Sequence, residues 1–170
     1  TEGQIFLNGR DVRSWDLKDL RQMFGVVPQK AVLFTGTIEE NLCWGKPELQ
    51  SDEMQQALEI AQAAEFVYKL PMGVQTKVER GGQNFSGGQK QRLTIARALA
   101  AQPEILVLDD SSSALDFATD AALRQALKES CGDMTVLLVS QRASSIKQAD
   151  KILVFDDGEL VGSGTHAQLM

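Results

Sequence analysis

Short apolar runs recur along the chain, and two of them show no alternation with polar residues. Ile105–Leu108 follows Pro103, and Val136–Val139 has the same character. Continuous apolar runs of this length are typical of strands buried on both faces of a parallel sheet. A third strand is predicted at Gly25–Val27, and Pro28 should end it because proline cannot donate a hydrogen bond to a sheet ladder.

Helical patterns lie between these runs. Residues 90–101 are rich in Ala, Leu and Arg, and Asp116 is a sensible N-cap for a helix over residues 117–130. Ser51 is expected to cap another helix, and residues 14–23 predict a shorter one. Helices that alternate with apolar strands indicate an α/β fold built around a parallel sheet.

Two tight turns are predicted near the ends of the chain. Asn8-Gly9 follows the apolar run Gln4–Leu7, and Asp157-Gly158 separates two apolar runs. Asn-Gly and Asp-Gly are strong signals for a hairpin turn. Gly164-Thr165-His166 is expected to open a last helix.

Composition narrows the class of protein. With 170 residues, 43% hydrophobic and 24% charged, the chain is long and apolar enough for one domain with a core. Its net charge of −6 and the lack of a basic run argue against a nucleic-acid partner. Cys43 and Cys131 lack metal-site spacing and are expected to be reduced thiols. No apolar run is long enough to span a bilayer, so membrane association is expected to come through a partner or another segment.

The turn Asn84–Gln89 is the first candidate for chemistry. Ser86 and Gln89 have the spacing of a capping box, so Ser86 is expected to be a helix N-cap. Gly87 and Gly88 have no Cβ, which lets another molecule approach the backbone. The first N–H groups of a helix favour a phosphate. The alternative is that this segment only starts a helix.

Two adjacent carboxylates, Asp109 and Asp110, end the run Ile105–Leu108. Open α/β sheets place their ligands at the carboxyl ends of their strands. Carboxylates there suit a hard cation such as Mg²⁺ and a water that must be oriented. The alternative is an exposed acidic corner without a ligand.

Together these motifs resemble the ATP-binding cassette (ABC) family. Ser86–Gln89 resembles its signature, Leu108–Asp110 its Walker B motif and Ser113–Asp116 its D-loop, in the family's order and spacing. The resemblance implies a RecA-like P-loop NTPase core with a parallel sheet and an inserted α-helical subdomain. The single domain 1–170 would then divide into a core of residues 1–30 and 102–170 and a helical subdomain of residues 31–101.

The resemblance also implies site roles, with ATP and Mg²⁺ as cofactors. Asp110 and Gln141 are the expected catalytic positions, and Asp109 and Gln29 would hold Mg²⁺. The residues expected to bind ATP are Gln29, Ser86, Gly87, Gly88, Gln89 and Asp116. Family members form head-to-tail dimers, so the signature and Asp116 would face the partner's ATP.

Residues 31–42 resemble the form that this loop takes in ABC exporters, where it meets the coupling helices of the transmembrane domain. Phe34 and Ile38 are therefore either contacts to that domain or core residues. Residues 76–81 resemble the exporter segment before the signature. This resemblance implies attachment at the cytoplasmic face of the cell membrane, through transmembrane domains that this chain lacks.

Two departures from the family fall in one expected site. Asp110 stands where most members carry a glutamate, and Gln141 stands where they carry a histidine. Aspartate is one methylene shorter, and glutamine cannot accept a proton near neutral pH. The only histidine, His166, is not expected to substitute. We therefore expect an ATP site with impaired hydrolysis in an asymmetric heterodimer, whose partner's site this chain's signature completes.

A third departure is that no G-x-x-x-x-G-K-[ST] motif, the phosphate-cradling loop, occurs in the sequence. The sequence is therefore expected to be a nucleotide-binding domain without its N-terminal strands and phosphate loop. Two alternatives stay open. One is a non-transport ABC protein acting on nucleic acid or ribosomes, and the other is a regulatory module without hydrolysis.

Overall fold

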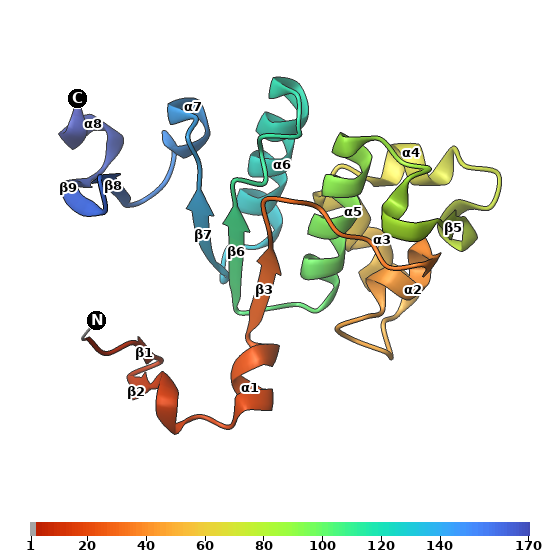
Figure 1. Ribbon diagram of the computed structural model, residues 1–170, viewed down its shortest axis with the longest axis horizontal. Coiled ribbons are helices and arrows are strands. Elements are labelled where there is room, and N and C mark those ends of the chain that lie inside the picture. The colour runs from red at the N-terminus through yellow and green to blue at the C-terminus, as the bar shows by residue number, and fades with distance from the viewer. Residues whose placement is uncertain (1–2) are drawn as a thin grey trace.

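The centre of the fold is a three-stranded parallel sheet with the strand order β3-β6-β7. A computed structural model describes residues 3–170 of the chain. The strands are β3 (Phe24–Val27), β6 (Ile105–Asp109) and β7 (Thr135–Val139). All three strands predicted from apolar runs are confirmed, and β6 lies between the other two (Figure 1).

Helices cover one face of this sheet and extend beyond its β3 edge. α5 (Gly87–Ala100) and α6 (Phe117–Ser130) each bury an apolar stripe next to the sheet, and α3 (Ser51–Ile60) packs on α5. The core joins strands and helices through buried side chains such as Val27, Leu58, Leu93, Leu106, Leu108 and Leu123. In Figure 1 the smaller helices lie on the far side of α5 from the sheet. They are α2 (Ile38–Leu42) and α4 (Ala64–Tyr68), near the short hairpin of β4 (Gly36–Thr37) and β5 (Lys77–Val78).

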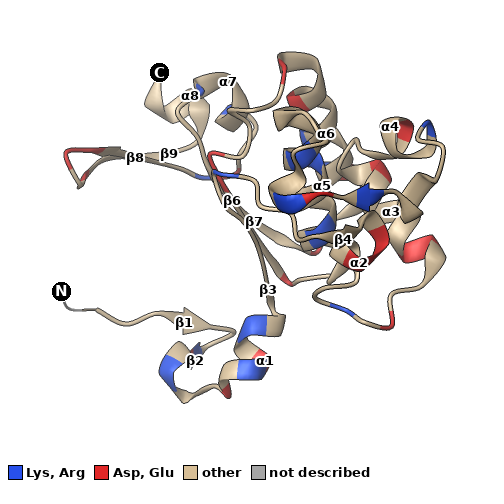
Figure 2. Cartoon of the chain, turned by 45° about the vertical axis from the view of Figure 1, so that its right-hand side comes forward, with Lys and Arg blue, Asp and Glu red and all other residues tan. Residues whose placement is uncertain are grey.

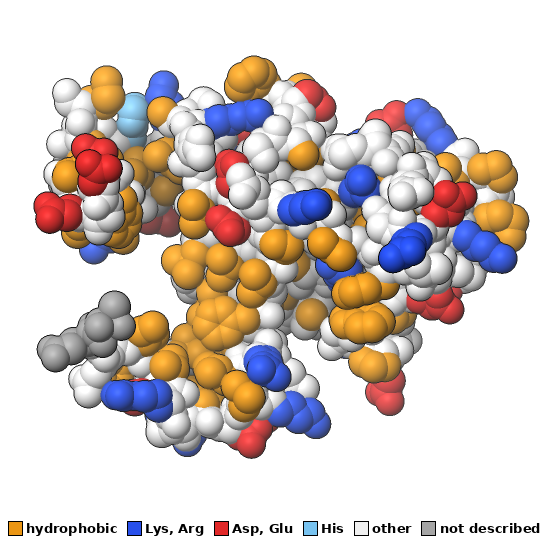
Figure 3. All heavy atoms as spheres, viewed as in Figure 1, with side chains coloured by type: hydrophobic (Ala, Val, Ile, Leu, Met, Phe, Trp, Pro, Cys, Tyr) orange, Lys and Arg blue, Asp and Glu red, His pale blue; other side chains and the backbone are white. Residues whose placement is uncertain are grey.

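The prediction that β7 is buried on both faces is wrong. Leu137 is 51% and Val139 is 56% exposed, and Val26 of β3 is 58% exposed. The helices pack against only one face of the sheet, so the residues that point to the other face stay in contact with solvent. Val136, on the covered face, is still 38% exposed because β7 is an edge strand. Figure 3 shows hydrophobic side chains gathered on the flank that faces the two terminal hairpins.

Both predicted hairpins are confirmed. β1 (Phe6–Leu7) pairs with β2 (Arg10–Asp11), and β8 (Ile152–Asp156) pairs with β9 (Glu159–Gly164). Their turns have positive φ at Asn8, Gly9, Asp157 and Gly158, as a two-residue hairpin turn requires. The predicted strand from Gln4 is shorter than expected, because pairing begins only at Phe6. After β9, Thr165 caps the expected last helix, α8 (His166–Leu169).

Several helix ends differ from their predicted positions. The helix expected over residues 14–23 is α1 (Leu17–Gln22), because the Asp16 carboxylate caps it by accepting the Lys18 N–H at 2.8 Å. Gln50 rather than Ser51 is the N-cap of α3, since its N–H donates to Glu53 at 3.0 Å. The remaining elements are η1 (Val12–Ser14), η2 (Gly73–Gln75), η3 (Arg80–Gly82) and α7 (Ala143–Ile146).

Across residues 3–170, no helix combines the length and the apolar character needed to cross a membrane. The two cysteines are free thiols, as expected, and burial raises the pKa of both Cys43 and Cys131.

Candidate functional site

The carboxyl ends of the three parallel strands bring together the candidate residues of the sheet. Gln29 comes two residues after β3, Asp109 is the last residue of β6, and Gln141 comes two residues after β7. The register pairs Asp109 with Val139, and the Asp110 N–H donates to the Val139 carbonyl at 2.9 Å. Because parallel strands end at the same edge, these polar side chains share one rim of the sheet.

Gln29 and Asp110 are in direct contact. The Gln29 amide Nε2 donates to Asp110 Oδ2 at 3.0 Å across 81 positions of sequence. Asp110 is half-buried and has a positive φ of 42°, which is uncommon for a residue other than glycine. The backbone turns sharply at this position and aims the carboxylate toward the segment after β3.

Asp109 has a different environment. It is exposed, and within residues 3–170 no hydrogen bond to its carboxylate is found. Its oxygens and the free amide oxygen of Gln29 are hard donors of the kind that Mg²⁺ prefers. No group of three His, Cys, Asp or Glu side chains in the described part of the chain could hold a metal ion. Mg²⁺ commonly takes one or two protein oxygens and completes its shell with phosphates and waters, so the residues present fit it.

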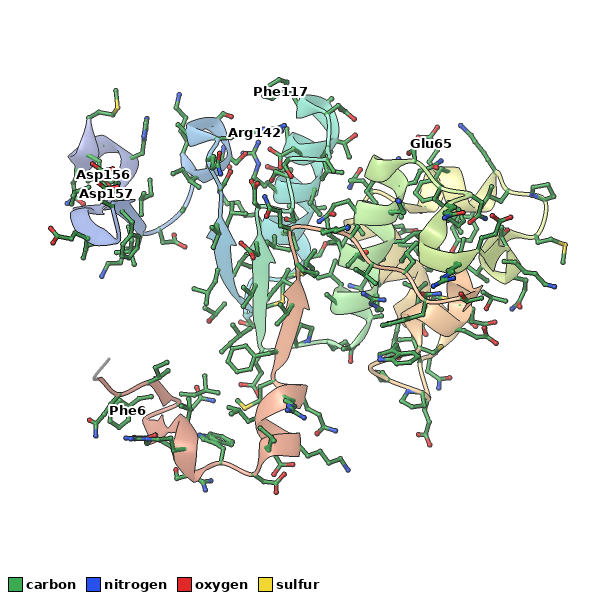
Figure 4. The ribbon with its side chains drawn as sticks, viewed as in Figure 1. Phe6, Glu65, Phe117, Arg142, Asp156 and Asp157 are labelled. Atoms are coloured by element: carbon green, nitrogen blue, oxygen red, sulfur yellow. The ribbon has the colours of Figure 1, made fainter. Side chains whose placement is uncertain are left out.

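Gln141 is exposed, whereas the next residue, Arg142, is held in place. Its guanidinium donates to the carbonyls of Leu115 and Ser113, both at 3.3 Å, and lies 5.1 Å from the ring centroid of Phe117. Figure 4 shows Arg142 and Phe117 near each other above the sheet. The loop after β7 is therefore attached to the loop after β6.

The N-terminus of α5 has the geometry that the sequence predicts. Ser86 is its N-cap, the Gln89 N–H donates to Ser86 Oγ at 3.3 Å, and the Ser86 N–H donates to Gln89 Oε1 at 2.9 Å. The helix begins at Gly87, directly after the predicted N-cap and three residues before the helical run 90–101, because this capping box already fixes its first turn. In Figure 1 this end of α5 lies toward the carboxyl edge of the sheet.

The two glycines of this helix end differ in their surroundings. A Cβ at Gly87 would meet nothing within 4 Å, so the backbone there is open to an approaching molecule. A Cβ at Gly88 would lie 3.2 Å from the Ala114 carbonyl oxygen, which is a tight contact. Gly88 therefore lets the end of α5 pack against the loop that follows Asp110.

Asp116 caps α6, as predicted. Its carboxylate accepts the Thr119 N–H at 2.9 Å and the Thr119 hydroxyl at 2.7 Å, and these bonds lower the pKa of Asp116. Burial lowers the pKa of Arg92 on α5, and the negative charge of Asp116 opposes that shift. The first turns of α5 and the loop that ends at Asp116 therefore lie close together.

Phe34 and Ile38, predicted to be either core residues or contacts to a transmembrane domain, differ in their burial. Ile38 is 1% exposed and belongs to the core, whereas Phe34 is 38% exposed. Phe34 stacks on Trp44 at 4.3 Å between ring centroids, and the Arg97 guanidinium lies 4.9 Å from the Phe34 ring. We call Phe34, Trp44 and Arg97 the aromatic stack. Lys and Arg are interspersed with Asp and Glu over the surrounding helices (Figure 2).

Sequence reasoning missed a group of polar residues behind this edge. The buried Asp120 of α6 accepts hydrogen bonds from Ser112 and Ser145, and Arg142 binds the loop carbonyls described above. One signal was available, because Asp120 shares the helical face of Leu123 and Leu127, both buried. A polar residue on a buried face needs partners, and the sequence did not reveal which ones.

The chain is similar to known proteins in both sequence and structure. The family described as ABC transporter matches residues 1–113. The chain is 45% identical over 168 residues to an uncharacterized ABC transporter ATP-binding protein, YfiB, of Bacillus subtilis (strain 168), covering 99% of this chain and 29% of that protein. It is also 40% identical over 170 residues to a protein of Staphylococcus aureus (strain NCTC 8325 / PS 47) that is provisionally named a multidrug export ATP-binding/permease protein. This match covers 100% of this chain and 29% of that protein.

Among solved structures, the chain is similar to a bacterial Atm1-family ABC exporter with ATP bound. The TM-score is 0.94 and the sequence identity 37%, over 99% of this chain and 30% of that chain. The chain therefore spans less than a third of the length of these relatives.

Proposed function

This chain belongs to the ABC transporter family, and we propose that it is the ATP-binding part of an exporter that couples ATP hydrolysis to transport. One observation carries the proposal: Gln29, Asp109, Asp110 and Gln141 lie at one edge of a parallel sheet, and the capped end of α5 lies toward the same edge. The similarity to a multidrug export protein and to an Atm1-family exporter supports export as the process.

In this proposal the sheet edge holds this chain's own nucleotide. Asp109 and the Gln29 amide oxygen would hold Mg²⁺, directly or through water, and Gln141 would contact the terminal phosphate. When bound, Mg²⁺ neutralises charge that develops on the phosphate oxygens. Asp110 would orient the attacking water, and the Gln29 amide would fix the direction of its carboxylate.

The same proposal makes this site poor at hydrolysis. The Asp110 carboxylate is one methylene shorter than a glutamate, and Oδ2 already accepts a hydrogen bond from Gln29. A displacement on the order of 1 Å can slow a reaction about 100-fold. Gln141 can donate to a phosphate but cannot relay a proton as a histidine would.

The end of α5 would serve a second nucleotide, held by a partner subunit. Ser86 and Gly87 are exposed, and open space surrounds Gly87. The first N–H groups of a helix attract phosphate, so Ser86, Gly87, Gly88 and Gln89 would bind the partner's ATP with Asp116 beside them. We infer an asymmetric heterodimer in which this chain completes the more active site.

The aromatic stack is the proposed contact to a transmembrane domain. Trp44 is 66% exposed, and a surface aromatic of that size favours an interface over isolation in solvent. The stack lies in the helical part, residues 31–101, which we propose is a subdomain distinct from the core of residues 1–30 and 102–170. The chain would then work at the cytoplasmic face of the membrane.

ATP turnover by the full-length protein that contains this chain tests the proposal. Reconstituted in vesicles together with its proposed partner subunit, it should hydrolyse ATP in the presence of Mg²⁺ and lose that activity when EDTA removes the metal. If this assembled transporter hydrolyses no ATP, the proposed function is wrong.

A further inference from the structure

A single buried carboxylate joins the two loops that follow β6 and β7. The Asp120 side chain is 2% exposed. Its Oδ1 accepts from Ser112 Oγ at 2.7 Å, and its Oδ2 accepts from Ser145 Oγ at 3.0 Å. Ser112 lies in the loop between Asp110 and α6, whereas Ser145 lies on α7, which begins two residues after Gln141. Asp120 thus binds both loops at once.

Arg124 completes the environment of this carboxylate. Its Nη2 lies 3.1 Å from Asp120 Oδ2, and its Nη1 donates to the Ser144 carbonyl at 3.3 Å. Burying an ionised carboxylate costs free energy unless charges and hydrogen bonds compensate it. Two hydroxyls and one guanidinium supply that compensation, so the cluster resists separation of the two loops.

Arg142 attaches the same two loops a second time, nearer the surface. It comes directly after Gln141, and its guanidinium donates to the carbonyls of Ser113 and Leu115. Leu115 directly precedes Asp116. The loop that carries Gln141 and the loop that carries Asp116 are therefore connected both in the interior and at the site.

We propose that Asp120 is a positioning residue that makes residues 111–116 and residues 141–145 move as one unit. The proposal rests on the proposed function, in which Asp116 faces the partner's nucleotide and Gln141 faces this chain's own. A shift of Asp116 on dimer contact then moves Gln141 as well. Asp120, Ser112 and Ser145 thereby link occupancy of one nucleotide site to geometry at the other.

Hydrogen exchange of backbone amides tests this coupling without any ATP turnover. Ser145→Ala removes the bond between α7 and Asp120 and leaves the bond from Ser112 intact. Loss of one hydrogen bond to a charged group should speed exchange about tenfold in residues 141–145. If the two loops move together, exchange in residues 111–116 should speed up by a similar factor.

Ser144→Ala is the matched control, because Ser144 is exposed and its hydroxyl makes no hydrogen bond found among residues 3–170. It should leave exchange in both loops unchanged. Ser112→Ala removes the hydrogen bond from the other loop to Asp120. It should likewise speed amide exchange in both loops. Acceleration confined to the mutated loop in both variants would overturn the coupling.

ATP turnover by the assembled full-length transporter distinguishes failure of the positioning role from failure of the proposed function. Ser145→Ala should lower kcat while KM for ATP stays within about twofold, because the cluster does not touch the nucleotide. If the unmutated protein hydrolyses no ATP, the proposed function fails, although the exchange result still stands. If it hydrolyses ATP and Ser145→Ala alters neither exchange in residues 111–116 nor kcat, only the positioning role fails.

Discussion

The Gln29 amide donates a hydrogen bond to the Asp110 carboxylate at 3.0 Å, although 81 positions separate the two residues in sequence. Gln29 follows β3 and Asp110 follows β6, and these strands are paired in parallel. The contact explains how a short carboxylate is kept aligned at the sheet edge. It also occupies Asp110 Oδ2, one of the two carboxylate oxygens that could otherwise accept a hydrogen bond from the attacking water. This is consistent with the proposed impaired hydrolysis at this site.

Restoring the family's usual residues should increase hydrolysis at this site. A Ser86→Arg background should disable the proposed partner site. The residual rate is then expected to report on the chain's own site. Adding Asp110→Glu and Gln141→His should raise that residual rate by about 100-fold, since reach and proton handling both return. The measurement is ATP turnover by the assembled transporter, with the proposed partner subunit present, in vesicles.

Asp109→Glu, one residue earlier, is the matched control for side-chain length. It should not raise the rate, because Asp109 is proposed to hold the metal rather than the water. An unchanged residual rate in the triple variant would argue that the two departures do not cause any impairment.

The glycines at the start of α5 provide a second prediction. Gly87→Ala should leave the free energy of unfolding unchanged or raise it by up to about 1 kcal/mol, because alanine favours a helix and the site is open. It should nevertheless reduce ATP turnover, because Gly87 is proposed to bind the partner's phosphate and the new methyl group would occupy part of that open space. Urea unfolding and turnover are measured on the same protein.

Gly88→Ala should behave differently. Its Cβ would lie 3.2 Å from the Ala114 carbonyl oxygen, so the variant should be less stable than Gly87→Ala by about 1 kcal/mol. Equal stabilities would mean that the contact between α5 and the loop before Asp116 is looser than the structure indicates.

Much of this arrangement was predictable from local sequence. The strand over the apolar run Ile105–Leu108, the capping box at Ser86 and the N-cap at Asp116 depend on residues within a few positions of one another, and all three are confirmed. The exposure of β7 was not predictable, because Val136–Val139 is continuously apolar and such a run predicts a buried strand. What decides its burial is which face of the sheet the helices cover.

The cluster around Asp120 was missed for a similar reason. Its partners Ser112 and Ser145 are 8 and 25 positions away, on different elements. Serine hydroxyls are common on surfaces, and only the packing of α6 against both loops turns these two into buried donors. Periodicity could have indicated that Asp120 is buried, but not what it binds.

The cap at Asp116 predicts a pH dependence with a definite sign. Hydrogen bonds from the Thr119 N–H and hydroxyl lower the pKa of Asp116 in the folded state. The stability that this carboxylate contributes is therefore complete above its unfolded pKa, about 3.9, and is lost as the pH falls through the lower folded value. The Tm difference between the unmutated protein and Asp116→Ala should shrink as the pH falls below about 4.

Thr119→Val gives a direct check by NMR titration of the Asp116 carboxyl. Removing the hydroxyl should raise the pKa of Asp116 toward its ordinary value, while the remaining backbone bond keeps it below that value. A Tm difference that stays constant from pH 6 to pH 3 would contradict the cap's contribution.

The aromatic stack predicts a footprint of the membrane domain. Trp44 is 66% exposed and Tyr68 of α4 is 53% exposed, so both should react with hydroxyl radicals in this chain alone. In the full-length protein, oxidation of Trp44 should fall about threefold or more, because the proposed interface covers it. Tyr68 serves as the internal reference, and its oxidation should change little. Equal oxidation of Trp44 in both proteins would place the interface elsewhere.

The central claim is that this chain's own site contributes little hydrolysis while its signature completes a competent partner site. The most direct test compares Asp110→Asn with Ser86→Arg, each in the assembled full-length transporter. We predict that Asp110→Asn changes ATP turnover by less than about twofold, whereas Ser86→Arg lowers it by about tenfold or more. Abolition of all turnover by Asp110→Asn would contradict the claim, because the hydrolysis would then depend on this chain's own carboxylate.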